Sequence, residues 1–536
     1  MNSTDVIVLG GGLAGLTLAL QLRARLPSLS ITVLERNRFP VREAAHKVGE
    51  STVEIGADYL ANVIGLRDHL RACHLKKFGF RFFFTDGRRD IEAVTELGAS
   101  DYLHTPGYQI DRGLLENHLA SLVQTQGITL ISGATVRDIA MAPQMEDGRL
   151  GAHTVSFEES EAPRELRSQW LVDASGRAGL LRRKLDLQTD NGHHANAVWF
   201  RLDTRIRVDD WSADPDWQAR CAKPERWLST NHLVGPGYWV WLIPLSGGAH
   251  SVGIVADAKI HPLREMNSFD RALDWLGRHQ PRLAESVAAA RGSLMDFAAL
   301  KHFSYGCRTV FSTRRWALTG EAGPFLDPFY SPGTDFIAIA NTYITDLIVR
   351  EQAGEPIDMR AALYERFYQS FYDSTLDLYR DQYRIFGHAE ALPAKVLWDY
   401  TYYWGVLAQL YFQRRLTDLG ALSTLRDELL SLQSVNREVQ ALLRDWADRA
   451  PATNPARLLD QAALPWFAEL NRTLGDTLDR DAFIQRLRDN HGLLLSLAAQ
   501  ILQRARESLP DLRGDKLEAL LSTAPPRQSL LFPTAA

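Results

Sequence analysis

The chain has 536 residues, 45% of them hydrophobic, and its 60 Lys and Arg against 65 Asp and Glu give a formal net charge of -5. This length predicts two or three globular domains, and a mildly acidic chain without a long basic tract is not expected to bind nucleic acid. The three cysteines are far apart and lack the spacing of metal ligands, which indicates a reducing, cytoplasmic setting. No stretch approaches the roughly 20 apolar residues of a membrane span.

The N-terminal residues predict a strand–helix–strand unit that binds a dinucleotide. Residues 5–9 and 31–34 are continuous apolar runs typical of buried strands, and residues 13–26 have the pattern of a helix. Residues 10–15, Gly-Gly-Gly-Leu-Ala-Gly, permit a tight turn, the approach of a pyrophosphate and close helix packing, while Glu35 is placed to accept a hydrogen bond from a ribose. The candidate ligands are Gly10, Gly12, Leu13, Ala14, Gly15, Glu35 and Arg36. The alternative is a glycine turn without a ligand.

The remaining elements follow from periodicity and turn residues. We expect helices over 53–75 and 113–126 on either side of a hairpin over 79–93, then a surface turn over 158–165 and a strand over 169–172. Strands with hydrophilic insertions follow from about 190 to 300, including a hairpin of 238–245 with 251–256, and another strand covers 315–319. After Asn341 the pattern is almost wholly helical, and the tail from Thr523 is expected to be extended or disordered.

Two later motifs resemble those of the glutathione-reductase-like FAD superfamily. Asp173-Ala174-Ser175-Gly176 resembles its D-A-S-G segment, and Gly320-Glu321 resembles its G-D motif, with Glu in place of Asp. Arg112 matches the arginine that begins the long helix beside the flavin in this superfamily; outside that pattern it would be a solvated arginine at a helix start. The resemblance implies FAD as the cofactor, with Arg112, Asp173, Gly176, Gly320, Glu321 and Gly333 among its ligands.

The expected fold class is α/β: a Rossmann-like FAD-binding domain with an inserted β-sheet substrate domain and a helical C-terminal region. We assign residues 1–75, 107–187 and 300–350 to the FAD-binding domain and 76–106 and 188–299 to the substrate domain. Residues 351–522 form the expected helical domain, and 523–536 the extended tail.

The sequence Trp239-Val240-Trp241-Leu242-Ile243-Pro244 resembles the W-x-W-x-I-P signature of flavin-dependent halogenases. Because side chains alternate along a strand, both indoles are expected on one face; in the family this motif separates the flavin from the substrate. The alternative is that the indoles belong to an ordinary core. Gly49, Glu50 and Ser51, in the segment that begins at His46, resemble the family's G-E-S loop near the flavin.

Lys77 is the catalytic candidate, together with Trp239 and Trp241. Lys77-Phe78-Gly79 resembles the K-x-G of phenol- and pyrrole-type halogenases, in which hypohalous acid is held by a lysine against the substrate. An ammonium suits this role because it donates hydrogen bonds to the hypohalite oxygen. Without the resemblance, a lysine beside Lys76 is more often a solvated surface charge, and Lys47 is a rival candidate.

Residues 323–333 align with the halide-binding segment of the family. Tryptophan halogenases have a glutamate where this chain has Tyr330, so free tryptophan is a disfavoured substrate. The expected halide ligands are Pro332, Gly333 and Thr334, but Pro332 has no N–H to donate. One lost donor to an anion costs about 1.5 to 3 kcal/mol, which weakens halide binding roughly tenfold to hundredfold.

Three functions remain open. The first is an FAD-dependent halogenase of secondary metabolism that uses reduced FAD, O2 and halide on an electron-rich aromatic, free or bound to a carrier protein. No second dinucleotide fold is visible in the sequence, so the flavin is reduced either by a nicotinamide that docks transiently or, as the resemblance implies, by a separate flavin reductase. The second is an FAD-dependent monooxygenase without halide chemistry, and the third a non-catalytic flavin-binding partner. The aromatic-rich stretch 398–412 either lines a substrate tunnel or serves as helix packing.

Overall fold

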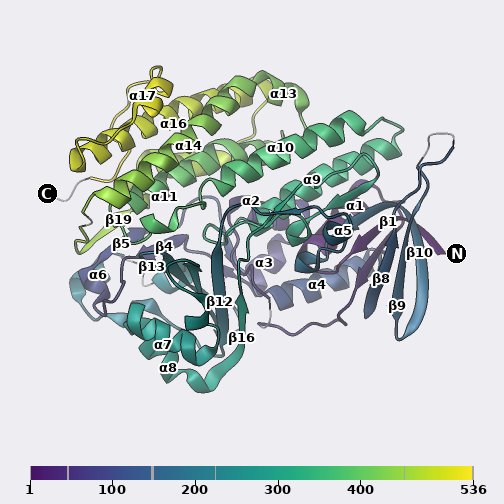
Figure 1. Ribbon diagram of the computed structural model, residues 1–536, viewed down its shortest axis with the longest axis horizontal. Helices are drawn as coiled ribbons and strands as arrows, with labels where there is room; N and C mark the ends of the chain where they lie inside the picture. Colours follow the sequence, from purple (N-terminus) through teal and green to yellow (C-terminus); the bar gives the residue numbers. More distant parts are fainter. Residues whose placement is uncertain are drawn as a thin grey trace. The chain divides into compact units, whose positions relative to one another are not determined.

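Two structural units are each assembled from three separated segments of the chain (Figure 1). The first, here called the nucleotide unit, comprises Met1–Ala72, Ile110–Asn191 and Ser304–Tyr372; the second, the sheet unit, comprises Cys73–Gln109, Gly192–Phe303 and Asp373–Ala536. The computed structural model describes residues 2–44, 47–146, 150–221, 223, 225–451 and 453–533. His46 and the last three residues of the predicted tail lie outside these ranges.

A seven-stranded sheet organises the nucleotide unit. Its order is β7-β2-β1-β10-β9-β8, with β18 also paired to β10. The strands are β1 Asn2–Leu9, β2 Ile31–Glu35, β7 Thr129–Ser132, β8 Ala134–Ala140, β9 His153–Glu159, β10 Ala162–Asp173 and β18 Trp316–Leu318. β1 is parallel to β2 and β10, and β2 to β7, whereas β8, β9 and β10 are antiparallel neighbours. This is the doubly wound arrangement expected for a nucleotide-binding fold, with an antiparallel extension at one edge.

The helices of the nucleotide unit are α1 Leu13–Arg25, α2 Glu54–Asp58, α3 Arg67–Cys73, α4 Arg112–Thr125, α5 Leu180–Lys184, α9 Gly333–Gln352 and most of α10 Asp358–Leu376. A short ladder joins β11 Gln188–Thr189 to β17 Gly306–Cys307. The single helix expected over 53–75 is instead divided by a π-helical turn, Tyr59–Val63, and by Gly65, whose φ of 83° ends that turn. Glycine adopts this conformation without strain.

The predicted surface turn over 158–165 was wrong, because most of these residues belong to β9 and β10. The chain reverses at Ser160 and Glu161, which both have positive φ. Pro163 lies in the part of β10 that precedes the pairing with β1 at Leu166. A proline is tolerated there because the strand has a neighbour on one side only.

An eight-stranded sheet forms the centre of the sheet unit, in the order β16-β12-β15-β14-β13-β4-β5-β19. Its strands are β4 Phe80–Phe83, β5 Thr95–Gly98, β12 Ala195–Leu202, β13 Thr230–Gly235, β14 Tyr238–Pro244, β15 His250–Asp257, β16 Leu294–Leu300 and β19 Arg457–Asp460. β3 Leu75–Lys76 pairs separately with β6 Tyr108–Gln109. One face of the sheet packs against α7 Phe269–His279 and α8 Pro281–Ala289 around a buried apolar core (Figure 1).

The C-terminal helices belong to the sheet unit, not to a separate helical domain. They include α11 Ala391–Tyr402, α12 Gln409–Phe412, α13 Leu419–Thr424, α14 Arg426–Arg449, α15 Pro465–Arg472, α16 Arg480–Ser508 and α17 Asp515–Leu520, and α6 Pro215–Ala219 lies earlier in the chain. The region also contains one unexpected strand, β19, which is parallel to β5. The tail is extended but packed: Leu530 donates its N–H to Gln500 and is buried.

In the described ranges, no helix has the length and apolar character needed to cross a bilayer. The same residues contain no group of three or more His, Cys, Asp or Glu arranged to hold a metal ion. The three cysteines are free thiols.

Candidate functional site

The glycine turn between β1 and α1 has no room for side chains at its two ends. Gly10 has a φ of 109°, and a Cβ there would lie 2.4 Å from the carbonyl oxygen of Ala174. A Cβ on Gly15 would lie 2.0 Å from the carbonyl oxygen of Gly10. The turn is therefore held tightly between α1 and the segment after β10, as a dinucleotide fold requires.

The N-terminus of α1 is suited to an anion. Gly12 is the N-cap, no side chain caps the helix, and its first turn, which starts with Leu13 and Ala14, contains no acidic residue. Among the described residues other than its chain neighbours, the one atom within 4 Å of a Cβ on Gly12 would be Oε1 of Glu116, at 3.9 Å. The first-turn N–H groups have no partner within the helix and carry its positive dipole end, so these residues fit a pyrophosphate.

Glu35 ends β2 beside this turn. Its Oε2 accepts the N–H of Gly11 at 2.7 Å and its Oε1 the N–H of Asn37 at 2.8 Å, and a Cβ on Gly11 would clash with Glu35 Cβ at 2.8 Å. No sequence pattern explains the second glycine of the run, Gly11; its contact with Glu35 does. Each carboxylate oxygen retains a lone pair for a ribose hydroxyl, and the neighbouring Arg36 is exposed.

The buried Asp173 side chain holds the D-A-S-G segment in place through hydrogen bonds to the backbone. The buried carboxylate accepts the N–H of Ser175 at 2.9 Å and that of Leu181 at 2.7 Å, and burial raises its pKa. Both oxygens are therefore bonded to the loop's own backbone, whereas Gly176, with a φ of 61°, has open space where a Cβ would be. Of the two predicted ligands here, only Gly176 offers a surface that a flavin could approach.

The G-E segment packs against the start of α1. Gly320 has a φ of 60°, and a Cβ there would touch Ala14 Cβ at 3.0 Å. Glu321, one third exposed, lies 3.5 Å from the Arg177 guanidinium. Arg182 was not predicted from the sequence; its buried Nη1 donates to the carbonyl oxygens of residues 321, 322 and 323. Arginines are frequent in this stretch, so no sequence signal singled it out.

The G-E-S loop is attached to α4. The carbonyl oxygen of Glu50 accepts the N–H of Ile110 at 2.6 Å, and Glu50 and Ser51 are both buried. Arg112 donates to the carbonyl oxygen of Val48 at 2.8 Å, and a Cβ on Gly49 would lie 2.7 Å from Arg112 Nη1. The predicted residues of this loop and the predicted arginine therefore form one cluster.

Lys47, the rival lysine, lies in the same cluster. Its ammonium is ion-paired with Glu116, which also binds Arg112 Nη2 at 2.7 Å. Burial, then the adjacent Arg112, lowers the pKa of Lys47 to about 8. This lysine is thus engaged with an acid in the nucleotide unit.

The predicted halide segment leads into α9. Ser331 has a φ of 54°, Pro332 is the N-cap and α9 begins at Gly333, which is exposed. The N–H groups of Gly333 and Thr334 belong to the first turn, where an α-helix provides no carbonyl partner. The Asp335 carboxylate accepts the N–H of Gly56 at 2.8 Å, so the segment is fixed against α2.

Trp239 and Trp241 do lie on one face of β14. Their ring centroids are 5.7 Å apart, and the alternate residues Tyr238, Val240 and Leu242 enter the core beneath α7 and α8. Trp241 fits because its partner on β15 is Gly253, where a Cβ would lie 2.1 Å from the indole. The indoles are therefore not part of that main core.

Lys77 is buried, with 5% of its surface exposed, although the adjacent Lys76 is exposed. Its ammonium lies 3.3 Å from the ring centroid of Phe80. Phe80 contacts His232, which contacts Trp239, with ring centroids 5.4 and 5.3 Å apart. In the sheet unit, contacts through Phe80 on β4 and His232 on β13 thus link Lys77, which precedes β4, to Trp239 on β14.

Aromatic residues of the C-terminal segment extend this cluster. Tyr400 on α11 contacts Phe80, with ring centroids 6.1 Å apart, and Trp404 lies 4.8 Å from Tyr400. The Tyr383 hydroxyl is 3.1 Å from Trp239 Nε1, which donates to it. The predicted aromatic stretch is therefore in part a wall around the Lys77 cluster, whereas Trp398 points elsewhere and donates to Asn436.

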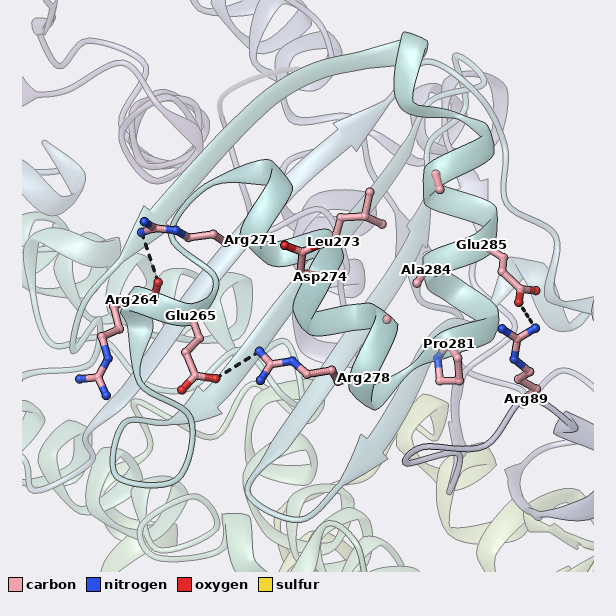
Figure 2. Close-up of a pocket in the computed structure, with 12 residues that line it drawn as sticks. Arg89, Arg264, Glu265, Arg271, Leu273, Asp274, Arg278, Pro281, Ala284 and Glu285 are labelled. Atoms are coloured by element: carbon pink, nitrogen blue, oxygen red, sulfur yellow. Dashed lines mark hydrogen bonds and ion pairs between the residues drawn. The ribbon is translucent and has the colours of Figure 1, made fainter.

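A pocket of about 780 Å³ lies away from these residues, between α7 and α8 (Figure 2). Its charged side chains are largely paired with one another, Arg278 with Glu265 at 3.2 Å and Arg89 with Glu285. Because it contains none of the predicted site residues, we do not assign it to the active site.

Comparison with known proteins is consistent with this geometry. Residues 3–237 match the family described as FAD binding domain. The chain is 27% identical over 436 residues to the flavin-dependent halogenase chlA of Dictyostelium discoideum, covering 77% of this chain and 71% of that protein. It is 24% identical to a 1H-pyrrole-2-carbonyl-(peptidyl-carrier protein) brominase of Pseudoalteromonas luteoviolacea, covering 68% and 81%.

Among solved structures, halogenase PltM in complex with phloroglucinol and FAD has a similar fold. The TM-score is 0.66 at 16% sequence identity, covering 92% of this chain and 98% of that one. The fold and the FAD motifs define an FAD-dependent enzyme of the α/β class. The chain is similar to flavin-dependent halogenases over much of its length.

Proposed function

We propose that this enzyme halogenates an electron-rich aromatic substrate, free or attached to a carrier protein, in secondary metabolism. Reduced FAD, one O2, one halide ion and one proton would give oxidised FAD, hypohalous acid and water. Electrophilic substitution on the substrate would then replace a ring hydrogen by halogen and release a second water. The electrons are proposed to come from a separate flavin reductase.

The observation that carries this proposal is the burial of Lys77 against Phe80 on the sheet face that also presents Trp239 and Trp241. Burial places the Lys77 ammonium 3.3 Å from the ring centroid of Phe80. The ammonium can donate a hydrogen bond to the oxygen of hypohalous acid and so hold the electrophilic halogen toward a ring. The surrounding aromatic side chains suit an aromatic substrate.

The proposed halide site is the first turn of α9. Pro332 supplies no N–H, but the N–H groups of Gly333 and Thr334 remain, and the positive end of a 20-residue helix favours an anion. We therefore propose weak halide binding through two amides. The carrier-bound type of substrate is supported by the similarity to the pyrrole-carrier brominase.

The test is a product assay with purified protein, FAD, a flavin reductase, NADH, O2, and monochlorodimedone with chloride or bromide. Halogenated product that requires both halide and enzyme supports the proposal. A panel of phenols and carrier-bound pyrroles should be run in parallel, because the probe need not resemble the natural substrate. Oxygenated product without any dependence on halide contradicts the proposal.

The lack of an N–H donor at Pro332 favours a second candidate function, that of an FAD-dependent monooxygenase of the same fold. In that case the site would transfer oxygen directly to the substrate and Lys77 would serve to bind it. The halide dependence of product formation distinguishes the two. A non-catalytic flavin-binding role would give stoichiometric FAD uptake and no product of either kind.

A further inference from the structure

Glu116 is a buried acid beside the glycine turn that is expected to bind the negatively charged pyrophosphate of FAD. It lies on α4 with a side chain that is 1% exposed, and its Oε1 lies 3.9 Å from the position that a Cβ on Gly12 would occupy. Gly12 is the glycine of the turn whose missing side chain lets a pyrophosphate approach the backbone. A carboxylate beside that approach opposes an anionic ligand.

The carboxylate is balanced by two cations. Arg112 Nη2 lies 2.7 Å from Glu116 Oε1, and the Lys47 ammonium is bonded to Oε2. Arg112 also lies against Gly49, where a Cβ would come within 2.7 Å of Nη1. Lys47 and Arg112 are the residues of this cluster best placed to attract a phosphate, and both are ion-paired with Glu116. The three side chains together carry a net charge of +1 instead of +2.

We propose that Glu116 weakens FAD binding by pairing with both Lys47 and Arg112 beside the pyrophosphate turn and offsetting one of their two positive charges, so that FAD exchanges readily. The carboxylate competes with the pyrophosphate for the same two cations. It also repels the negative charges of the ligand. This inference rests on the FAD site alone and holds whether or not the enzyme halogenates. It suits a flavin that is reduced elsewhere, because such a cofactor has to arrive and leave in every turnover.

The first experiment measures the dissociation constant of FAD for the apoprotein by fluorescence titration at several salt concentrations. Glu116→Gln keeps the size of the side chain and removes its charge. We expect it to bind FAD at least about tenfold more tightly than the parent protein, with a steeper dependence on salt because one more cation faces the ligand. The matched control is Glu43→Gln, which removes an exposed carboxylate close in sequence and should leave the dissociation constant within twofold.

The second variant tests the same idea without removing Glu116. Lys47→Gln should weaken FAD binding several-fold and flatten the salt dependence, and in the Lys47→Gln background the gain from Glu116→Gln should be smaller. The proposal is overturned if Glu116→Gln binds FAD equally or more weakly while its melting temperature stays at the parent value. It is also overturned if Glu116→Gln does not fold and Lys47→Gln binds FAD as the parent does.

Discussion

Lys76 and Lys77 differ in solvent exposure although they are adjacent in the chain. Both have the same side chain and neighbouring places in the chain, yet Lys76 is exposed over Tyr102 while Lys77 is buried over Phe80. Composition and periodicity do not indicate which of the two lysines is buried. Only the resemblance to the K-x-G motif identified Lys77 as the catalytic candidate. Burial depends on β4, β13 and α11, which come together from distant parts of the sequence.

We expect Lys77→Ala to abolish halogenated product while leaving FAD binding and the rate of flavin reoxidation close to those of the parent. The reason is that the ammonium is proposed to act after halide is oxidised. Lys76→Ala is the matched control, because it removes the adjacent ammonium from the surface. Product yield is measured by liquid chromatography and flavin by absorbance; an unchanged yield in Lys77→Ala removes this lysine from the mechanism.

Phe80 is expected to position the Lys77 ammonium through its ring face, since a cation over an aromatic ring gains about 0.5 to 2 kcal/mol. Phe80→Leu should lower the halogenation rate several-fold, because the charged ammonium loses a favourable contact. Phe80→Tyr keeps the ring and should retain the parent rate. Equal halogenation rates for the Leu and parent proteins would assign Phe80 to packing only.

At the scale of elements, local patterns located the strands and helices that bear the predicted site residues. β1, α1, β2, α4 and the β14–β15 hairpin lie where apolar runs and turn residues placed them. No local sequence pattern predicts the π-helical turn after α2. The buried hydrogen-bond network around Asn341, which donates to the Tyr59 hydroxyl at 2.9 Å and accepts from the Thr319 hydroxyl at 2.7 Å, has no local pattern either. These features depend on contacts between α1, the π-helical turn, β18 and α9, which no local window contains.

The start of α9 yields a prediction for halide. Pro332→Ser restores one N–H at the N-cap position and adds a hydroxyl, which is a favoured N-cap group. Its own side chain could satisfy a first-turn amide, but the added backbone donor is expected to lower the halide concentration for half-maximal rate about tenfold. Steady-state rates against bromide concentration check this. Pro328→Ala, four residues earlier, is the control, and equal halide dependence in Pro332→Ser and parent would place the halide elsewhere.

At the scale of the whole molecule, the sequence identified the α/β class and its discontinuous nucleotide-binding part, but not the place of the C-terminal third. Local sequence patterns predict only that the C-terminal third is helical, whereas residues 373–536 share a unit with the sheet. The four-residue strand β19 pairs with β5 across some 360 residues of chain: Ser100 donates its N–H to Asp460 at 2.9 Å. A strand so short and so distant from its partner has no signal in sequence.

Each unit contains a buried histidine whose surroundings accept only the neutral ring. In the nucleotide unit, His153 Nδ1 accepts the N–H of Ala142 at 3.1 Å, and burial lowers its pKa to about 4. In the sheet unit, His250 Nδ1 accepts the N–H of Ile206 at 3.3 Å, and burial, then Arg205, lowers its pKa to about 3. Protonation of either Nδ1 would remove the acceptor and put charge where water does not reach.

The free energy of unfolding should therefore fall as pH decreases from about 6.5, where the unfolded histidines begin to bind protons, toward pH 4. The sign follows because the unfolded chain binds protons that the folded chain excludes, and each histidine contributes about 1.4 kcal/mol per pH unit in this window. His153→Gln and His250→Gln should each reduce the slope, measured by denaturant unfolding from pH 7 to 4.5, while exposed His104→Gln should not. If the units unfold in separate transitions, each substitution should flatten only the transition of its own unit; equal slopes in all four proteins would contradict the assignment.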